Sequence, residues 1–201
     1  NLGFAKANNQ ALKKARGEYI WLLNPDTLVQ EDTPQKLIEV MEADGKIGLL
    51  GCKILNDDGS LQLACRRSFP TPWVAFTKLL GLANVFPKSK WFGRYNLTHL
   101  NPDEAYEVEA ISGSCMFIRR EALEEVGTLD EIFFMYGEDL DWCYRFGQSG
   151  WKVYYTPTTS IIHYKGESSK VAMWDTNTHF YKAMEIFTRK HFKTSRRFPI
   201  H

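Results

Sequence analysis

The sequence lacks the markers of several large protein classes. No apolar run approaches the roughly 18 to 20 residues that a membrane-spanning helix needs, and the polar opening NLGFAKANNQ lacks the apolar core of a signal peptide. It contains no CxxC pair and no GxGxxG, GxxxxGK[ST] or GxSxG segment, so no zinc finger, dinucleotide fold, P-loop or α/β-hydrolase is indicated. With 25 basic and 24 acidic residues, the chain gives no reason to expect a nucleic-acid partner.

Cysteine is also scarce and scattered. The four cysteines, at positions 52, 65, 115 and 143, suggest neither a disulfide framework nor a zinc site. We expect buried, reduced thiols and a cytoplasmic setting. The 201 residues, 44% of them hydrophobic, suffice for one core without staples, and no repeat or linker divides 1–201. Because the chain begins at Asn1 without a methionine, we expect a piece of something longer.

Apolar periodicity and turn residues predict an α/β fold in which strands and helices alternate. The turn at Asn24-Pro25-Asp26 follows directly on a buried strand, where open α/β sheets usually bind their ligands. The predicted helices are 4–15, 33–45, 120–126, 138–149 and 176–192, and the predicted strands are 19–23, 47–55, 60–65, 106–111, 114–118, 151–155 and 160–163.

Charge is segregated along the chain although the total is balanced. Residues 59–102 contain no acidic residue, whereas 103–141 contain 12 of the 24. The basic aromatic excursion, residues 66–102, has two interpretations: an irregular segment with its aromatics on the core and its cations in water, or a surface for a membrane or an acceptor. A second basic segment, 176–201, carries the last predicted helix.

The densest group of chemically useful side chains is Glu138, Asp139 and Asp141, in the first turn of a predicted helix. They repel one another, and Arg145 at i+4 from Asp141 supplies part of the counter-charge. The plain interpretation is that they cap the helix. The apolar residues around them favour a second one, in which a desolvated carboxylate has a raised pKa and acts as a general base.

Two further positions stand at strand ends. Asp26, with Asn24 beside it, offers oxygen ligands for Mg²⁺ shared with substrate phosphates, although Asn-Pro-Asp turns are more often structural. His163 ends an apolar strand and, taken alone, is best explained as a histidine with a satisfied hydrogen bond.

Together these segments resemble the inverting nucleotide-sugar glycosyltransferases of family 2, which have the GT-A fold, and most closely the rhamnosyltransferase type. The resemblance implies a GT-A-like mixed, mainly parallel sheet flanked by helices, in a single partial domain truncated at its N-terminus. The stretches that carry it are NLGFA with Asn8 and Asn9, YIWLLNPDT at 19–27, ISGSCMFIRR at 111–120, GTLDE at 127–131, residues 133–145, GWKV at 150–153 and IIHYKG at 161–166.

The resemblance also implies a role for each matching position. Asp139 would be the catalytic base and Glu138 would support the acceptor, while Asp26 and His163 would bind Mg²⁺ or Mn²⁺. The implied substrate-binding residues are Asn24, Gly113, Ser114, Asp141, Trp142 and Arg145.

The implied activity is transfer of a sugar, with inversion, from a nucleotide-diphosphate donor to a glycan or lipid-linked glycan acceptor at the cytoplasmic membrane face, in bacterial cell-surface polysaccharide synthesis. The family's first strands, which hold the nucleotide base, would precede Asn1. Their absence predicts an exposed sheet edge, and with it a homo-oligomer, a fragment or lost donor binding. The alternatives are a non-catalytic glycan- or partner-binding domain and a metal-dependent phosphohydrolase.

Overall fold

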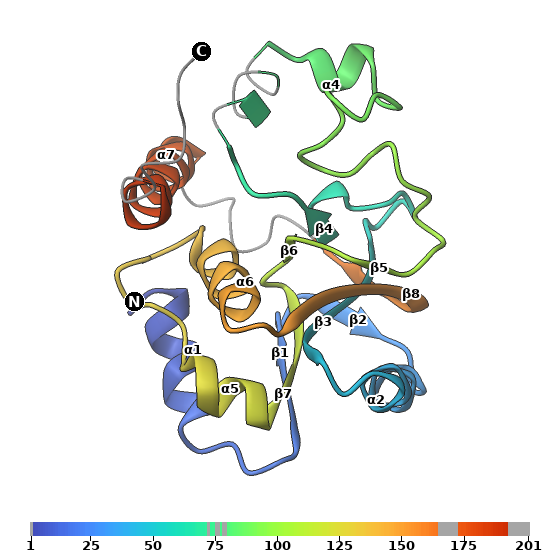
Figure 1. Cartoon of the computed structure of the whole chain (residues 1–201), viewed down its shortest axis with the longest axis vertical. Coiled ribbons are helices and arrows are strands. Elements are labelled where there is room, and N and C mark those ends of the chain that lie inside the picture. Colours follow the sequence, from blue (N-terminus) through green and yellow to red (C-terminus); the bar gives the residue numbers. More distant parts are fainter. Residues whose placement is uncertain (1, 72, 75–76, 78–79, 165–172, 193–201) are drawn as a thin grey trace.

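The structure is a computed structural model that describes residues 2–71, 73–74, 77, 80–164 and 173–192 (Figure 1). As the alternating pattern predicts, helices and strands follow one another along the chain. The helices are α1 (Phe4–Leu12), α2 (Thr33–Ala43), α4 (Leu82–Val85), α5 (Arg120–Val126), α6 (Glu138–Gln148) and α7 (Met173–His191), with a 3₁₀ turn, η1, at Leu63–Cys65. The strands are β1 (Tyr19–Leu23), β2 (Thr27–Val29), β3 (Ile47–Leu55), β4 (Arg66–Arg67), β5 (Tyr106–Glu107), β6 (Ala110–Ile111), β7 (Cys115–Arg119) and β8 (Lys152–His163).

The main sheet has the order β1-β7-β3-β8-β2, with β5 also paired to β8. The expectation of a mainly parallel sheet is wrong for the described strands, since β3 and β8 run parallel and the other pairings of this sheet are antiparallel. A parallel pair needs a long crossover, and α5 and α6 lie in the connection from β3 to β8. The strand β7 enters between β1 and β3 in the opposite direction.

Helices cover both faces of the sheet (Figure 1): α2 packs against β3 and β8, and α5 and α6 pack on the other side. Of the described buried apolar side chains, all but Val74 and Tyr95 form one continuous cluster, from Ala5 in α1 to Phe187 in α7. The four cysteines are buried and free, which confirms the expectation of reduced thiols. Among the described residues, we find no helix long and apolar enough to cross a membrane.

Four predicted strands differ from the structure, and of these the one expected at 106–111 is divided into β5 and β6. The returning strand at 60–65 is reduced to a single bridge, Leu55 to Leu61, because the chain turns into η1 immediately afterwards. The two strands expected at 151–155 and 160–163 are one twelve-residue strand, β8, whose pairing with β3 shifts register between Cys52 and Lys53. A register shift of this kind lets one strand continue through a local irregularity.

In the described sheet, β1 lies at one end of the strand order. Ile20 and Leu22 point into the core, and the alternating side chains are half-buried. An edge strand presents unpaired backbone groups that can add another strand. Association of two copies across β1 remains a prediction.

Candidate active site

The first part of the candidate site lies in the turn between β1 and β2. His163 is the last residue of β8 and pairs with Thr27, the first residue of β2, which brings it next to this turn. Its Nε2 atom lies 3.2 Å from Asp26 Oδ1 and 3.2 Å from Asn24 Nδ2. The sheet therefore brings together the three residues that the sequence predicts here.

Gln62 fixes the orientation and the tautomer of His163. Its amide oxygen lies 3.0 Å from Nδ1, and because such an oxygen only accepts, Nδ1 carries the ring proton. The other ring nitrogen, Nε2, faces Asp26 and the side-chain amide of Asn24. Gln62 is buried, and it is a site residue that the sequence analysis misses.

Asp26 and His163 fit a divalent cation. Asp26 Oδ1 is buried and has no hydrogen-bond partner, and Nε2 of His163, a second atom that can ligate a metal, lies 3.2 Å from it. A cation satisfies both. No group of three or more acidic, histidine or cysteine side chains placed to hold a metal occurs in the described residues, so the other ligands would come from the substrate and water, as Mg²⁺ commonly allows.

The second part of the site is the N-terminus of α6. Gly137 precedes the helix with φ of 81°, and a Cβ there would lie 3.0 Å from Ala183, so a glycine suits this position. Asp139 accepts hydrogen bonds from Gly113 N (3.1 Å) and Leu140 N (2.8 Å). Backbone donors hold its carboxylate in one orientation.

The counter-charge of Asp139 is Arg67 in β4. Its Nη2 atom lies 2.5 Å from Asp139 Oδ2, and both side chains are largely buried. Although burial alone would lower it, the pKa of Arg67 is held above its usual value by this carboxylate. The predicted pairing of Arg145 with Asp141 is confirmed (2.9 Å), so Arg145 supplies part of the counter-charge of the acidic cluster. Arg67, which supplies the part that faces Asp139, is a second site residue that was not predicted from the sequence.

Glu138 is the desolvated carboxylate of the site. It is 6% exposed, and its Oε2 atom has no hydrogen-bond partner. Burial, with repulsion from Asp139, raises the pKa of Glu138 to about 8. At neutral pH this side chain is therefore mostly protonated and can donate a hydrogen bond.

Gly113 and Ser114 connect the two parts of the candidate site, the β1–β2 turn with His163 and the N-terminus of α6. The backbone N–H of Asn24 donates to the carbonyl of Ser114 (3.0 Å), which extends the pairing of β1 with β7 by one step. Gly113 N, next in the chain, donates to Asp139. An unbroken line of contacts thus runs from Asp26 through His163, Asn24, Ser114 and Gly113 to Asp139.

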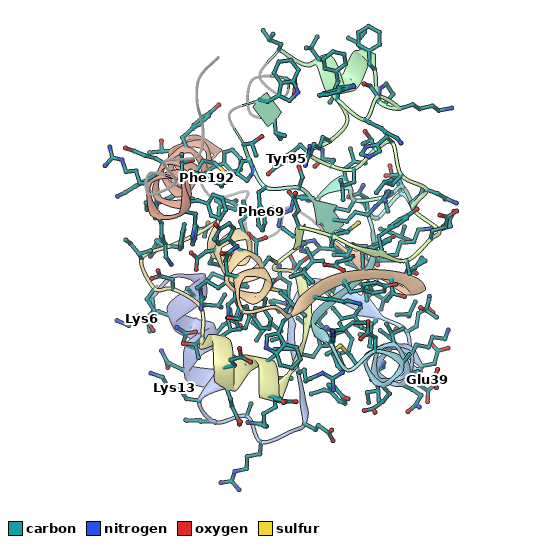
Figure 2. All side chains as sticks on the ribbon, viewed as in Figure 1. Lys6, Lys13, Glu39, Phe69, Tyr95 and Phe192 are labelled. Atoms are coloured by element: carbon teal, nitrogen blue, oxygen red, sulfur yellow. The ribbon has the colours of Figure 1, made fainter. Side chains whose placement is uncertain are left out.

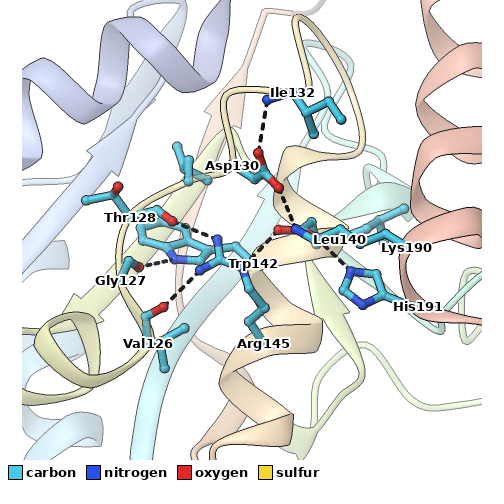
Figure 3. Close-up of polar contacts among 12 residues, drawn as sticks. Val126, Gly127, Thr128, Asp130, Ile132, Leu140, Trp142, Arg145, Lys190 and His191 are labelled. Atoms are coloured by element: carbon cyan, nitrogen blue, oxygen red, sulfur yellow. Dashed lines mark hydrogen bonds and ion pairs between the residues drawn. The ribbon is translucent and has the colours of Figure 1, made fainter. Parts of the chain in front are cut away.

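Three residues expected to bind substrate lie elsewhere (Figure 3). Asp141 is fully buried and accepts from Lys190 and His191 of α7, both at 2.7 Å. Besides pairing with Asp141, Arg145 donates hydrogen bonds to the carbonyls of Val126 and Thr128. Trp142 is fully buried, and its Nε1 donates to the carbonyl of Gly127. This geometry favours a packing role over the substrate contacts predicted for the three residues: Asp141 joins α6 to α7, while Trp142 and Arg145 join α6 to residues 126–128.

The pKa of Glu138 leads to a stability prediction. Between its ordinary value of 4.5 and about 8, the carboxyl ionises in the unfolded chain but stays protonated in the folded one, so it destabilises the fold increasingly as pH rises. Glu138→Gln cannot ionise. In urea unfolding, its stability relative to the parent should increase by about 2 to 4 kcal/mol from pH 4.5 to pH 8.

The exposed Glu121 in the first turn of α5 provides the matched control for this experiment. Glu121→Gln should change the stability difference from the parent much less over this pH range than Glu138→Gln does. An equally small change for Glu138→Gln would show that Glu138 is ionised in the folded protein.

The chain is similar in sequence to known proteins. Residues 1–127 match the sequence profile described as "Glycosyl transferase family 2". The chain is 30% identical over 180 residues to the N-acetylglucosaminyl-diphospho-decaprenol L-rhamnosyltransferase of Mycobacterium tuberculosis, covering 84% of this chain and 58% of the relative. It is 26% identical to the rhamnosyltransferase WbbL of Escherichia coli, covering 98% and 74%. The chain thus spans little more than half of the first of these relatives.

Solved structures show the same fold. The crystal structure of GalNAc-T7 with UDP, GalNAc and Mn²⁺ superposes with a TM-score of 0.59 at 19% identity, covering 93% of this chain and 34% of that one. The mannosyltransferase PcManGT from Pyrobaculum calidifontis, in complex with GDP-Man and Mn²⁺, gives a TM-score of 0.53 at 18% identity, covering 91% and 44%. The mixed sheet flanked by helices is therefore a GT-A-like fold.

Proposed function

Because the chain belongs to glycosyl transferase family 2, we propose that it moves a sugar, with inversion, from a nucleotide-diphosphate donor to a glycan acceptor in bacterial cell-surface polysaccharide synthesis. The observation that carries this proposal is the line of contacts from Asp26 to Asp139. It joins a pair of atoms suited to a cation to a carboxylate suited to remove a proton.

Asp139 is the proposed general base. Its three donors, Arg67, Gly113 N and Leu140 N, stabilise the negative charge and leave about one of four lone-pair sites unoccupied. Asp139 takes the proton of an acceptor hydroxyl as that oxygen attacks the anomeric carbon. The new C–O bond forms on the face opposite the leaving group, and the nucleoside diphosphate departs with the electron pair of the broken bond.

Asp26 and His163 are the residues that would hold a divalent cation, Mg²⁺ or Mn²⁺. When bound, such an ion neutralises the negative charge that develops on the leaving diphosphate. Asn24 contributes an amide beside Nε2 of His163, and Gly113 and Ser114 form the floor between donor and acceptor in this proposal.

Glu138 is proposed to orient the acceptor. Since its pKa of about 8 leaves it mostly protonated at neutral pH, it serves as a hydrogen-bond donor to an acceptor oxygen rather than as the base. The neighbouring Asp139 remains available for the proton. Two adjacent carboxyl groups thus divide two tasks.

The tautomer of His163 can be tested through Gln62. Gln62→Met removes the acceptor of the Nδ1 proton while nearly keeping the volume. Loss of such a supporting contact typically weakens metal binding by 10- to 100-fold, and we expect at least a roughly tenfold higher Kd for Mn²⁺ in a calorimetric titration. Gln35→Met, on the exposed face of α2, should leave the Kd unchanged. Equal Kd values for the parent, Gln62→Met and Gln35→Met would show that Gln62 does not support metal binding.

Transfer assays distinguish the proposed function from its alternatives. With a dTDP- or UDP-sugar, Mn²⁺ and a glycan acceptor, we expect a glycoside of inverted anomeric configuration and no free phosphate. Release of phosphate without an acceptor would instead indicate a phosphohydrolase. Glycan binding without any nucleotide binding would indicate a non-catalytic module.

A further inference from the structure

The basic aromatic excursion, residues 66–102, begins with β4, which pairs with β6 in a separate two-stranded sheet. The segment that follows β4 has an inner and an outer part. Its inner part packs on the core: Phe69 contacts Tyr144 and Phe187 of the two helices α6 and α7, and Tyr95 is buried. Figure 2 shows Phe69 and Tyr95 near the middle of the molecule. The backbone N–H of Ser68 donates to the carbonyl of Tyr95 (2.9 Å), which closes the neck of the excursion.

The outer part, the tip (residues 73–74, 77 and 80–94), exposes large apolar side chains. Five of the twelve exposed large hydrophobic residues of the described chain lie in this short stretch, namely Trp73, Leu80, Val85, Phe86 and Trp91. Trp91 is 72% exposed and Val85 66%. The rings of Trp73 and Phe86 both contact Phe92, so part of this surface is a contiguous patch rather than scattered residues.

The charged residues within the tip itself are all basic. Lys88 and Lys90 are exposed, and Arg94 is more than half exposed, with Glu109 of the body 3.6 Å away. No acidic residue occurs from Gly59 to Pro102. In Figure 1 the tip surrounds α4, at the end of the molecule opposite α1, α2 and α5.

From this arrangement we infer that the tip docks on a membrane surface that contains anionic lipids. Aromatic and aliphatic side chains enter the boundary between headgroups and acyl chains, while lysines attract the negative surface. Leu80 and Val85 cannot stack on bases, and thus the mixture favours lipid over nucleic acid. A bilayer also explains why the apolar residues and the cations lie together at one end of the molecule.

The docking surface is connected to the candidate site through a short path. Arg67, which pairs with Asp139, directly precedes Ser68 at the neck of the excursion. The lipid binding itself is independent of the proposed function. A further consequence, that the tip presents a lipid-linked acceptor to Asp139, rests on that function.

Co-sedimentation with vesicles tests the inference on the full chain. We expect binding to vesicles of equimolar phosphatidylglycerol and phosphatidylcholine, weaker binding at high salt because charges are then screened, and little binding to phosphatidylcholine alone. Lys88→Glu with Lys90→Glu should weaken binding at least about tenfold. Val85→Ser with Trp91→Ser should also weaken it about tenfold or more.

A matched pair of exposed apolar residues provides the control. Ile132→Ser with Tyr181→Ser changes residues that are 60% and 68% exposed but lie outside the tip, and it should leave vesicle binding unchanged. Equal binding by the Val85/Trp91 variant and the parent, or no binding by the parent, would overturn the inference.

Gel filtration tests the other occupant of the tip, a second copy of the chain. Suppose that the parent is an oligomer that does not bind vesicles, and that Val85→Ser with Trp91→Ser makes it dissociate. The tip is then a contact between copies, and the inference is wrong. If the parent binds a nucleotide in a Mn²⁺-dependent way but does not bind vesicles, the membrane-docking inference is wrong and the proposed function still stands.

Discussion

Asp139→Asn should lower the rate of sugar transfer by about 1,000-fold, within the range that a general base contributes. An amide cannot accept the acceptor's proton, and its single oxygen can keep only one of the hydrogen bonds from Gly113 N and Leu140 N, which reach different oxygens of Asp139. Transfer from a dTDP- or UDP-sugar, followed by product formation, measures the effect. If the variant keeps more than about a tenth of the parent rate, Asp139 is not the base.

The ion pair with Arg67 complicates this variant, and a second substitution resolves it. The sequence alone predicts that Asp139→Asn leaves folding intact. In the structure the change leaves the buried guanidinium of Arg67 without its carboxylate, which typically costs about 3 kcal/mol. Combining Asp139→Asn with Arg67→Gln replaces the ion pair by two amides and should recover stability. If the double variant is stable and still inactive, the loss of activity is chemical rather than structural.

Asp26→Asn should weaken Mn²⁺ binding by at least about 100-fold, since a direct ligand contributes no less than a supporting residue. Its buried Oδ1 atom accepts no hydrogen bond, so the neutral amide should not lower the melting temperature. Calorimetric titration with MnCl₂ and thermal unfolding separate the two effects. Chelation of the parent by EDTA should suppress transfer and donor binding together.

Asp57→Asn, in the exposed turn after β3, is the control for the same change of charge. It should bind Mn²⁺ as the parent does. An Asp26→Asn variant with unchanged Kd for Mn²⁺, or transfer that EDTA does not affect, would argue for a metal-independent enzyme.

Much of the fold could be predicted because it rests on local signals. The strand at 19–23 and the helices at 33–43, 120–126 and 138–148 follow from apolar periodicity, Pro34 and Gly127. Strand direction could not be predicted, because periodicity reports which face is buried and not which strand lies beside it. The resemblance to known enzymes supplied the family and the fold, but its mainly parallel sheet is wrong for the described strands.

The site shows the same division between local and distant information. Asp26, His163 and Asp139 stand at element ends that a sequence can locate. Gln62 and Arg67 act on residues 101 and 72 positions away, and nothing local marks them. One signal did point to Arg67: the acidic cluster of α6 requires a cation, and the acid-free segment from Gly59 offers several.

The most direct test of the central claim is a calorimetric titration of the protein with UDP- and dTDP-sugars, with and without Mn²⁺. The proposed site predicts that at least one nucleotide sugar binds in the presence of Mn²⁺, that binding is lost without it, and that Asp26→Asn abolishes it. Binding of a glycan with no uptake of either nucleotide sugar at any Mn²⁺ concentration would contradict the account.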